Sequence, residues 1–275
     1  TPKEEMMGVT SVFSCAGVDK QKFMKYTKTK GATYADWGKA WNQKTLGKED
    51  HLKTPYLQEE FEKARSLGII PQHTQNLSGS WSALSNAGEA TNLNLVHMNS
   101  YDGTNVHDLT AAEIEGRHQT LYALKALKAC VPGFEHAKLR NFSMTLGVRD
   151  TRKIIGKYNL NENDVLNEAR FTDSIGIFPE FLDGYSLLIL PTSGRYFHIP
   201  YRCIQSENID NLLAAGRCVS GDKISHAAMR NMMACTVTGQ AAGVAAAVSI
   251  REQKNTSCVS ISKIQKELLQ QGVRI

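Results

Sequence analysis

The stretch TGQAAGVAAAVSI, Thr238 to Ile250, constrains the fold of this chain more than any other segment. It is apolar almost throughout and has two glycines four residues apart. On a helix, one stripe at i, i+3, i+4, i+7, i+8 and i+11 consists of Gly239, Ala242, Gly243, Ala246, Ala247 and Ile250. Because Val244 and Val248 make the opposite side apolar as well, we expect a helix that is buried all round. Its glycines would allow another backbone or a flat ligand to approach closely.

A membrane span is the alternative for this segment. Such a span needs about 20 strongly apolar residues, and the run from Met232 to Ile250 approaches that length between Arg230 and Arg251. The GxxxG spacing is also a known helix–helix contact in lipid. However, the run holds more alanine than leucine, and it contains the polar residues Thr236, Thr238, Gln240 and Ser249. This composition favours a core helix beneath a sheet or a cofactor, and we expect no membrane span.

The residues before this helix suggest a ligand-facing unit. IDNLLAAG, Ile209 to Gly216, is predicted to be a buried strand. The loop RCVSGDKISHAAMRN follows, and the helix is expected to begin near Asn231–Ala234. In open α/β sheets, ligands bind beyond the carboxyl ends of strands, and the free amides of a helix N-terminus attract negative charge. The pattern therefore predicts an element that faces an anion or a cofactor.

The rest of the chain mixes both types of element. Strands are predicted over Met7–Cys15 and within residues 74–106, in GSWSAL and TNLNLVHM. A short helix capped by Asp19 should end at Gly31, and TPYLQEEFEKARSLGIIP predicts a helix with Pro55 near its start and Gly68 at its end. This mixture predicts an α/β (mixed α+β) fold.

Two further elements are predicted from local signals. Thr110 and Glu113 form a T-x-x-E capping box, and the apolar stripe of the following helix would comprise Ile114, Leu121, Leu124 and Leu127. The helix should end before Pro132. Downstream, YSLLIL (Tyr185–Leu190) and RYFHIPYRCI (Arg195–Ile204) flank the turn PTSG, which predicts that they pair as a hairpin. Tyr201 and Arg202 alternate on that strand, so only one of them would face a site.

Composition narrows the class of protein. The chain of 275 residues is 41% hydrophobic and 21% charged, which is ordinary for a soluble globular protein. The net charge of +5 is spread along the chain. We interpret the one dense basic run as the solvated face of a helix, and we expect no nucleic-acid partner; the run is Lys20, Lys22, Lys25, Lys28 and Lys30.

Cysteine and histidine spacing gives no metal motif. The six cysteines include no CxxC, and the eight histidines include no HExxH or HxxxH, so no metal site is predicted. Sparse cysteines predict reduced thiols and a cytoplasmic or other reducing intracellular compartment. Cys203, Cys218 and Cys235 are expected to be small buried apolar groups rather than redox pairs. The polar, lysine-rich start carries no secretory signal, and the first residue is Thr1, so a processed protein or a piece of a longer one is expected.

Several ordered motifs resemble a family of FAD-dependent oxidoreductases. The closing segment of that family is similar to PYRCIQSENIDNLLAAGRCVSGDKISHAAMRNMMACTVTGQAAGVAAA, Pro200 to Ala247. Two upstream stretches also resemble it, LTAAEIEGRHQTLYAL…VPGFEHAKL (Leu109–Leu139) and GVRDTRKIIGKYNL (Gly147–Leu160). The resemblance implies the carboxyl-terminal part of an FAD/NAD(P)-binding flavoprotein fold. Residues 1–208 would form a substrate or cap domain, and residues 209–275 would complete the FAD-binding domain.

The resemblance also implies a cofactor and residue roles. FAD would serve the two-electron oxidation or reduction of a small organic molecule. Gly216, Arg217 and Arg230 would lie at the flavin, and the amides of Met232, Met233 and Ala234 would stabilise negative charge on it. Ordinary helix-terminus and surface-arginine roles are the alternatives.

Two residues are candidates for catalysis. His226 could exchange a proton during hydride transfer, or it could simply bond a backbone group. Arg149 and Arg152 are three residues apart, so if this segment is helical they share a face, and one of them could clamp an anionic substrate; salt bridges to nearby carboxylates such as Asp150 and Asp173 are the alternative.

One feature departs from the family pattern. Such flavoproteins bind the FAD pyrophosphate with a G-x-G-x-x-G turn, and this sequence contains none. We therefore expect the carboxyl-terminal portion of a longer enzyme, whose N-terminal FAD-binding segment is missing from this chain. The alternative is a non-enzymatic binding module that keeps the fold without flavin. The substrate, the electron acceptor, the reaction direction and the oligomeric state stay open.

Overall fold

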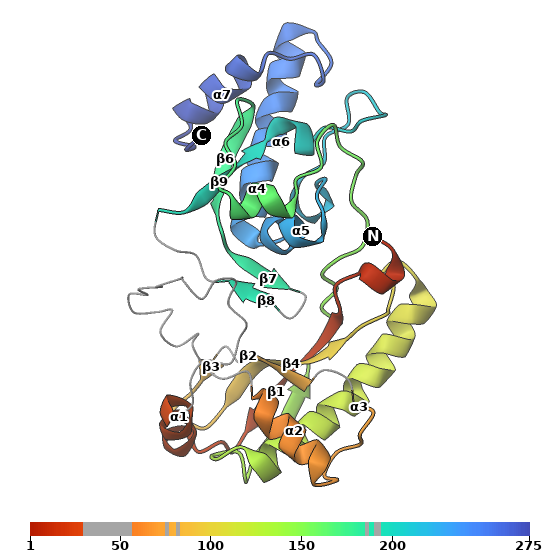
Figure 1. Cartoon of the computed structure of the whole chain (residues 1–275), viewed down its shortest axis with the longest axis vertical. Helices are drawn as coiled ribbons and strands as arrows, with labels where there is room; N and C mark the ends of the chain where they lie inside the picture. Colours follow the sequence, from red (N-terminus) through yellow and green to blue (C-terminus); the bar gives the residue numbers. More distant parts are fainter. Residues whose placement is uncertain (30–56, 75–76, 81–82, 185–186, 190–193) are drawn as a thin grey trace. The chain divides into compact units, whose positions relative to one another are not determined.

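A computed structural model describes residues 1–29, 57–74, 77–80, 83–184, 187–189 and 194–275 (Figure 1). Helices and antiparallel sheets are both present, so the predicted mixed α/β class is confirmed. The chain divides into two compact units, one formed mainly by residues up to Thr151 and the other mainly from Arg152 onward. The functional division at residues 208/209 stays a prediction.

The first unit is built on an antiparallel sheet. Its strands are β1 (Val9–Ala16), β2 (Leu77–Ser80), β3 (Ala83–Leu84), β4 (Ala90–Met98) and β5 (Lys138–Phe142). The strand order is β2-β4-β1-β5, and β3 pairs with β4. Val9 lies opposite Met98 and Phe13 lies opposite Phe142. The strands predicted at Met7–Cys15 and within residues 74–106 are therefore confirmed.

The helices of this unit are η1 (Lys3–Glu5), α1 (Lys20–Thr29), α2 (Gln58–Ser66) and α3 (Val106–Cys130). Of these, α2 and α3 pack against strands of the sheet. Asp19 caps α1 as predicted, since its Oδ1 accepts the Lys22 amide at 3.0 Å. Gly68 follows α2 in a left-handed conformation, with φ 69°. Gly31 and Pro55 lie outside the described residues. The core residues include Phe13, Phe23, Phe61, Leu95 and Phe134.

The start of α3 differs from the prediction. Its N-cap is Asn105, whose side chain accepts the amides of His107 and Asp108. Thr110 lies one turn inside the helix, where its hydroxyl donates to the Val106 carbonyl at 2.9 Å. The predicted capping box is therefore wrong, because an asparagine one turn earlier caps the helix at least as well as a threonine.

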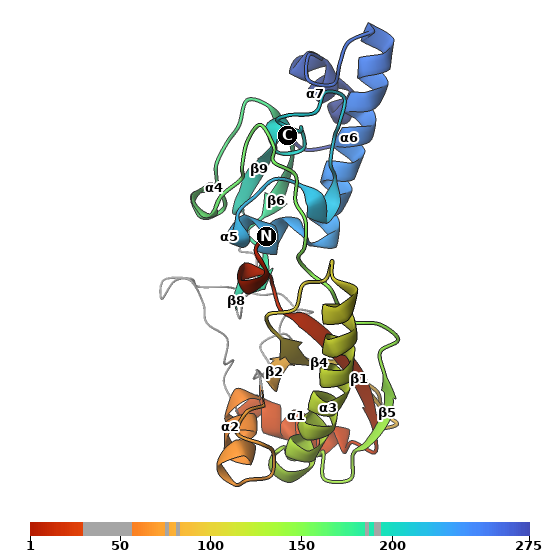
Figure 2. The same ribbon diagram turned by 90° about the vertical axis from the view of Figure 1, so that its right-hand side faces the viewer.

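The buried face of α3 also differs from the prediction. Ile114 and Leu121 are 56% and 44% exposed. The buried face is instead mostly small: Ala112, Gly116, Thr120, Ala123 and Ala126, with Gln119 and Leu127. Figure 2 shows α3 running alongside β1 and β4, and it packs against both strands. A Cβ at Gly116 would lie 2.9 Å from the Ser11 Cβ, so this close packing accepts only small residues on α3.

The second unit contains two short antiparallel pairs. β6 (Ser174–Pro179) pairs with β9 (Tyr196–Pro200), and β7 (Leu182–Gly184) pairs with β8 (Leu187–Ile189). Within the described residues, Leu187–Ile189 pairs with β7 and Tyr196–Pro200 pairs with β6, so the predicted pairing of YSLLIL with RYFHIPYRCI is wrong there. Residues 185–186 and 190–193, which include most of the PTSG turn, lie outside the described residues.

The segment after β9 leaves the sheet. Residues Tyr201–Cys203 form the short 3-10 helix η3. Tyr201 is buried and its hydroxyl donates to the Thr256 carbonyl at 2.9 Å, whereas Arg202 forms an ion pair with Asp173 at 3.0 Å.

The helices of the second unit are α4 (Glu162–Leu166), the 3-10 helix η4 (Gly216–Cys218), α5 (Lys223–Met229), α6 (Met232–Glu252) and α7 (Ile261–Gln270). The strand predicted over Ile209–Gly216 is wrong: within the described residues, Leu213 alone is paired there, in an isolated bridge with Gln205. The predicted loop before the long helix contains α5.

The long apolar helix α6 is buried on one side. It packs against β6 and α7, and its buried residues are Ala234, Thr238, Ala241, Ala245, Val248 and Ser249. The glycine stripe is largely exposed, and apart from neighbouring residues and the backbone of α6 itself, no atom of the described residues lies within 4 Å of a Cβ built at Gly239 or Gly243. The prediction of a helix buried all round is therefore wrong. By length and composition α6 could also cross a membrane, as many core helices of soluble proteins could.

Candidate functional site

Gly216 fixes the end of the extended segment against α6. Ala215 is extended, and Gly216 turns the chain with a left-handed φ of 71°. The Gly216 amide donates to the Thr238 Oγ1 at 2.9 Å. A Cβ at Gly216 would lie 3.7 Å from the Cys235 Sγ, so η4 rests on the first two turns of α6. We call this contact between η4 and the start of α6 the η4–α6 junction. The sequence did not predict that Thr238 belongs to it.

The N-terminus of α6 has no side-chain cap from its N-cap residue. Asn231 instead turns its amide group back toward α5, where Nδ2 donates to the carbonyls of Ala227 and Ala228 at 3.0 and 2.8 Å. Met232 and Met233 are 86% and 70% exposed, and Ala234 is buried. Uncapped first-turn amides and the helix dipole together favour a negatively charged group at this end.

Two arginines lie near this junction and differ in their surroundings. Arg217 is exposed on η4. The Arg230 guanidinium forms an ion pair with Asp183 at 2.9 Å, and its Nε donates to the Asp183 carbonyl at 2.9 Å. Arg230 thereby ties the end of α5 to β7.

The cysteines near the junction are not equally buried. Cys203 is fully buried as predicted, and burial raises its pKa. Cys218 is exposed, so its predicted burial is wrong. Cys235 is half-buried, with its Sγ 3.5 Å from the carbonyls of Met229 and Arg230. The pKa of Cys235 is raised, mainly by burial and also by the nearby Cys218, whereas the charges of Arg217 and Arg230 oppose this shift.

His226 lies within α5 and not in a loop. The N-cap of α5 is Asp222, whose Oδ1 accepts the Ser225 amide at 2.8 Å and whose Oδ2 accepts the Glu162 amide at 2.8 Å. His226 is buried, with 1% of its surface exposed. Its role in proton exchange stays a prediction.

Arg149 belongs to the first unit. The backbone around it is not helical, so Arg149 does not share a helical face with Arg152. Its guanidinium donates to the Asn94 Oδ1 and the His97 Nδ1, both at 3.1 Å, and to the Gly8 carbonyl at 3.5 Å. Because Nδ1 accepts this bond, Nε2 carries the His97 proton and donates to the Asn94 carbonyl at 3.2 Å. No sequence signal linked Arg149 to partners this far back in the chain.

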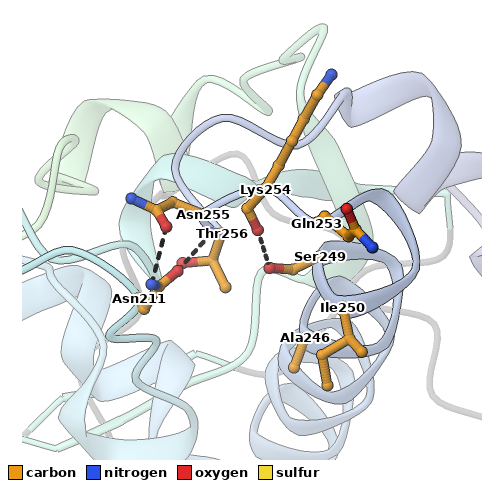
Figure 3. A pocket seen from close by; sticks show the side chains of 8 residues that line it. All are labelled: Asn211, Ala246, Ser249, Ile250, Gln253, Lys254, Asn255 and Thr256. Carbon is orange, nitrogen blue, oxygen red and sulfur yellow. Dashed lines mark hydrogen bonds between the residues drawn. The ribbon is translucent and has the colours of Figure 1, made fainter.

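A pocket of about 380 Å³ lies at the opposite, C-terminal end of α6 (Figure 3). Its polar groups largely satisfy one another: Asn211 donates to the Asn255 Oδ1 and accepts the Thr256 amide, both at 2.9 Å. None of the predicted site residues lines it; its lining residues are Asn211, Ala246, Ser249, Ile250, Gln253, Lys254, Asn255 and Thr256.

The second unit therefore brings most of the predicted site together. Gly216, Arg217 and Met232–Ala234 meet where η4 contacts α6, and Arg230 and His226 lie on the adjoining α5 segment. Arg149 lies in the other unit, and its role as a substrate clamp stays a prediction. Within the described ranges, no three His, Cys, Asp or Glu side chains are grouped so as to hold a metal ion.

Comparison with known proteins identifies the family. The family model described as FAD dependent oxidoreductase matches residues 2–268, which is nearly the whole chain. No curated protein and no solved structure matches the chain. FAD is the cofactor that this family implies. The chain therefore belongs to the FAD dependent oxidoreductase family.

Proposed function

We propose that this chain carries out FAD-dependent oxidation or reduction of a small organic molecule, with the flavin held where η4 meets the N-terminus of α6. The family match supports the general class of reaction. The observation that carries the location is the uncapped first turn of α6 beside the left-handed Gly216. When bound, FAD supplies the two-electron chemistry at N5.

The residues of the junction suit one edge of a flavin. The amides of Met232, Met233 and Ala234 would stabilise negative charge at the pyrimidine edge. Gly216 has no side chain to keep a flat ring at a distance. Arg217 adds a positive charge on the exposed side of η4. Arg230, bonded to Asp183, would keep α5 and β7 in place beside the flavin.

The substrate-side roles rest on two residues. Arg149, held by Asn94 and His97, would bind an anionic group of the substrate. His226 would hold or release a proton, which requires access that its burial in this structure restricts. We place the protein in the cytoplasm or another reducing intracellular compartment, as its sparse cysteines suggest.

The decisive experiment removes one amide from the first turn of α6. Met232 is the first residue of that helix, and Asn231 before it has φ −68° and ψ 147°, a conformation that proline's neighbour prefers. Met232→Pro should therefore keep the helix and delete one N–H, and Met232→Leu is the matched control that keeps it. Loss of one charge-assisted hydrogen bond should raise the Kd for FAD about tenfold or more, measured by flavin fluorescence at high protein concentration.

Two outcomes distinguish a wrong location for the flavin from a chain that binds no flavin. If the proline and leucine variants bind FAD with equal affinity and have unchanged circular dichroism, the first-turn amides of α6 do not contact the flavin. If flavin fluorescence is unperturbed by all three proteins up to saturating FAD, the alternative of a binding module without flavin is favoured instead.

A further inference from the structure

Two arginines from distant segments of the second unit lie on one tyrosine ring. Tyr196 belongs to β9 and is half-buried. The Arg170 Cζ lies 4.0 Å from the centre of its ring, and the Arg274 Cζ lies 5.0 Å from the same point. Arg170 precedes β6 and Arg274 follows α7, and Figures 1 and 2 both show the C-terminal end of the chain beside β9. The two guanidinium carbons are therefore at most about 9 Å apart, the sum of these distances.

The Arg170 guanidinium is held in one orientation. Its Nη1 donates to the backbone carbonyls of Glu168, Ala169 and Tyr196. Among the residues that the structure describes, its Nε has no acceptor, and its Nη2 has only the Glu168 carboxylate, at 3.8 Å. The Nε–Nη2 edge is the fork that binds a phosphate or carboxylate with two parallel bonds. This edge is thus available to a ligand.

Arg274 has no partner except the ring. It is exposed, and within the described part of the chain its guanidinium makes no hydrogen bond and no ion pair. Two carboxylates belong to this region, and Arg195 is bonded to both: to Glu180 through Nε, and to Glu168 at 3.2 Å. Three arginines therefore share two carboxylates. One positive charge is left without an acidic partner among these groups.

His198 adds a neutral ring beside the two arginines. Its ring lies 6.1 Å from that of Tyr196, at an interplanar angle of 18°. The Phe171 amide donates to its Nδ1 at 3.2 Å, so Nε2 carries the proton. Burial and the charge of Arg170 lower the pKa of His198, and the ring is neutral near pH 7. Arg170 and Arg274 therefore carry the positive charge beside the Tyr196 ring.

We propose that Arg170 and Arg274 bind the phosphate group of a small molecule beside the ring of Tyr196. Each guanidinium reaches a phosphate oxygen with a bond of about 2.8 Å, so one tetrahedral phosphate can bond to both across their separation. Two of its oxygens suit the Arg170 fork, and further oxygens remain for Arg274, whereas a carboxylate has only two oxygens in all. The site uses no residue of the η4–α6 junction, so it does not depend on the proposed flavin site.

The test is calorimetric titration of the flavin-free chain with inorganic phosphate and with glycerol 3-phosphate, at one ionic strength. Both ligands should bind, and their relative Kd values tell whether the site prefers the free ion or an ester. Acetate and glycerol should give no binding heat. In Arg274→Gln the Kd for phosphate should rise about tenfold or more, because one charge-assisted contact is lost. Arg170→Lys keeps the charge but loses the planar fork, so it should also weaken binding.

Arg251→Gln is the matched control, because it removes the same charge from another exposed arginine of the second unit. Arg251 lies at the end of α6 and is paired with Glu267 at 3.0 Å. Since solvent and salt screen exposed charges that do not touch the ligand, its Kd should stay within about twofold of that of the unmodified chain. The proposal is overturned if neither phosphate binds, if acetate binds as tightly as phosphate, or if Arg274→Gln and Arg251→Gln bind phosphate equally.

Discussion

Thr238 is a polar side chain in the buried face of an apolar helix. Its hydroxyl lies 3.1 and 3.0 Å from the carbonyls of Ala234 and Cys235, to which it donates, and its oxygen accepts the Gly216 amide. One side chain thus satisfies its own donor within α6 and ties η4 to that helix. In the sequence the same threonine served only as evidence against a membrane span.

Replacement of Thr238 by valine should destabilise the second unit. Valine keeps the shape but leaves the Gly216 N–H without its acceptor, which typically costs about 1–3 kcal/mol. Thr236→Val is the matched control, since Thr236 is exposed and its hydroxyl donates to the Met232 carbonyl within the same helix at 2.9 Å. That control should change the free energy of unfolding by about 0.5 kcal/mol or less. Urea denaturation of both variants measures the difference; equal midpoints would mean that the Gly216–Thr238 bond stabilises nothing.

Local signals predicted elements well where the decisive residues are neighbours in the chain. Asp19 caps α1 as expected, and β1 lies where its alternation placed it. Pairing was not predictable, because strand preference does not name a partner: β8 joins β7 and β9 joins β6. The segment Ile209–Gly216 was predicted as a strand from its apolar run, yet in the described structure it makes a single bridge; its Asp, Asn, Ala and Gly residues are depleted in strands.

The predicted burial failed on α3 and α6 in different ways. On α6 the small-residue stripe that includes Gly239 and Gly243 is exposed, whereas on α3 the buried face is made mainly of small residues and the larger Ile114 and Leu121 are exposed. A stripe of large apolar residues predicts a buried face only where the neighbouring element leaves room for it. Where the backbones come close, as at Gly116, alanine, glycine and threonine are buried instead.

Alanine substitution of one glycine in each helix should change the stability of the protein in opposite directions. At Gly116 an alanine Cβ would meet the Ser11 Cβ at 2.9 Å and the Met98 Cε at 3.0 Å, and such overpacking costs about 1–3 kcal/mol. At Gly243 the described residues leave the space open, so Gly243→Ala should raise stability by up to about 1 kcal/mol through helix propensity. Thermal unfolding should therefore give a lower Tm for Gly116→Ala and an equal or higher Tm for Gly243→Ala. A lowered Tm for Gly243→Ala would show that something covers the glycine face of α6.

At the scale of the whole molecule, the residues predicted for the site belong to different units: Arg149 to the first and the others to the second. The η4–α6 junction was predictable because Gly216, Arg217 and Met232–Ala234 lie close together in the sequence, within the family motif. The surroundings of Arg149 were not, because Gly8, Asn94 and His97 come from distant parts of the chain. A motif predicts chemistry only within one segment, and the bonds that hold Arg149 come from other segments of the first unit.

The residues at the η4–α6 junction predict how the affinity of the chain for FAD compares with its affinity for riboflavin, the flavin half of FAD. The junction offers amides, a glycine and exposed methionines to an isoalloxazine ring. The sequence has no G-x-G-x-x-G turn to bind a pyrophosphate at a helix start. Riboflavin and FAD should therefore bind this chain with Kd values within about threefold of each other, a free-energy difference below about 0.7 kcal/mol. Parallel fluorescence titrations with the two ligands measure the ratio. If FAD binds about a hundredfold more tightly than riboflavin, residues of this chain bind the pyrophosphate or adenosine. The prediction that the η4–α6 junction binds only the flavin half of FAD would then be wrong.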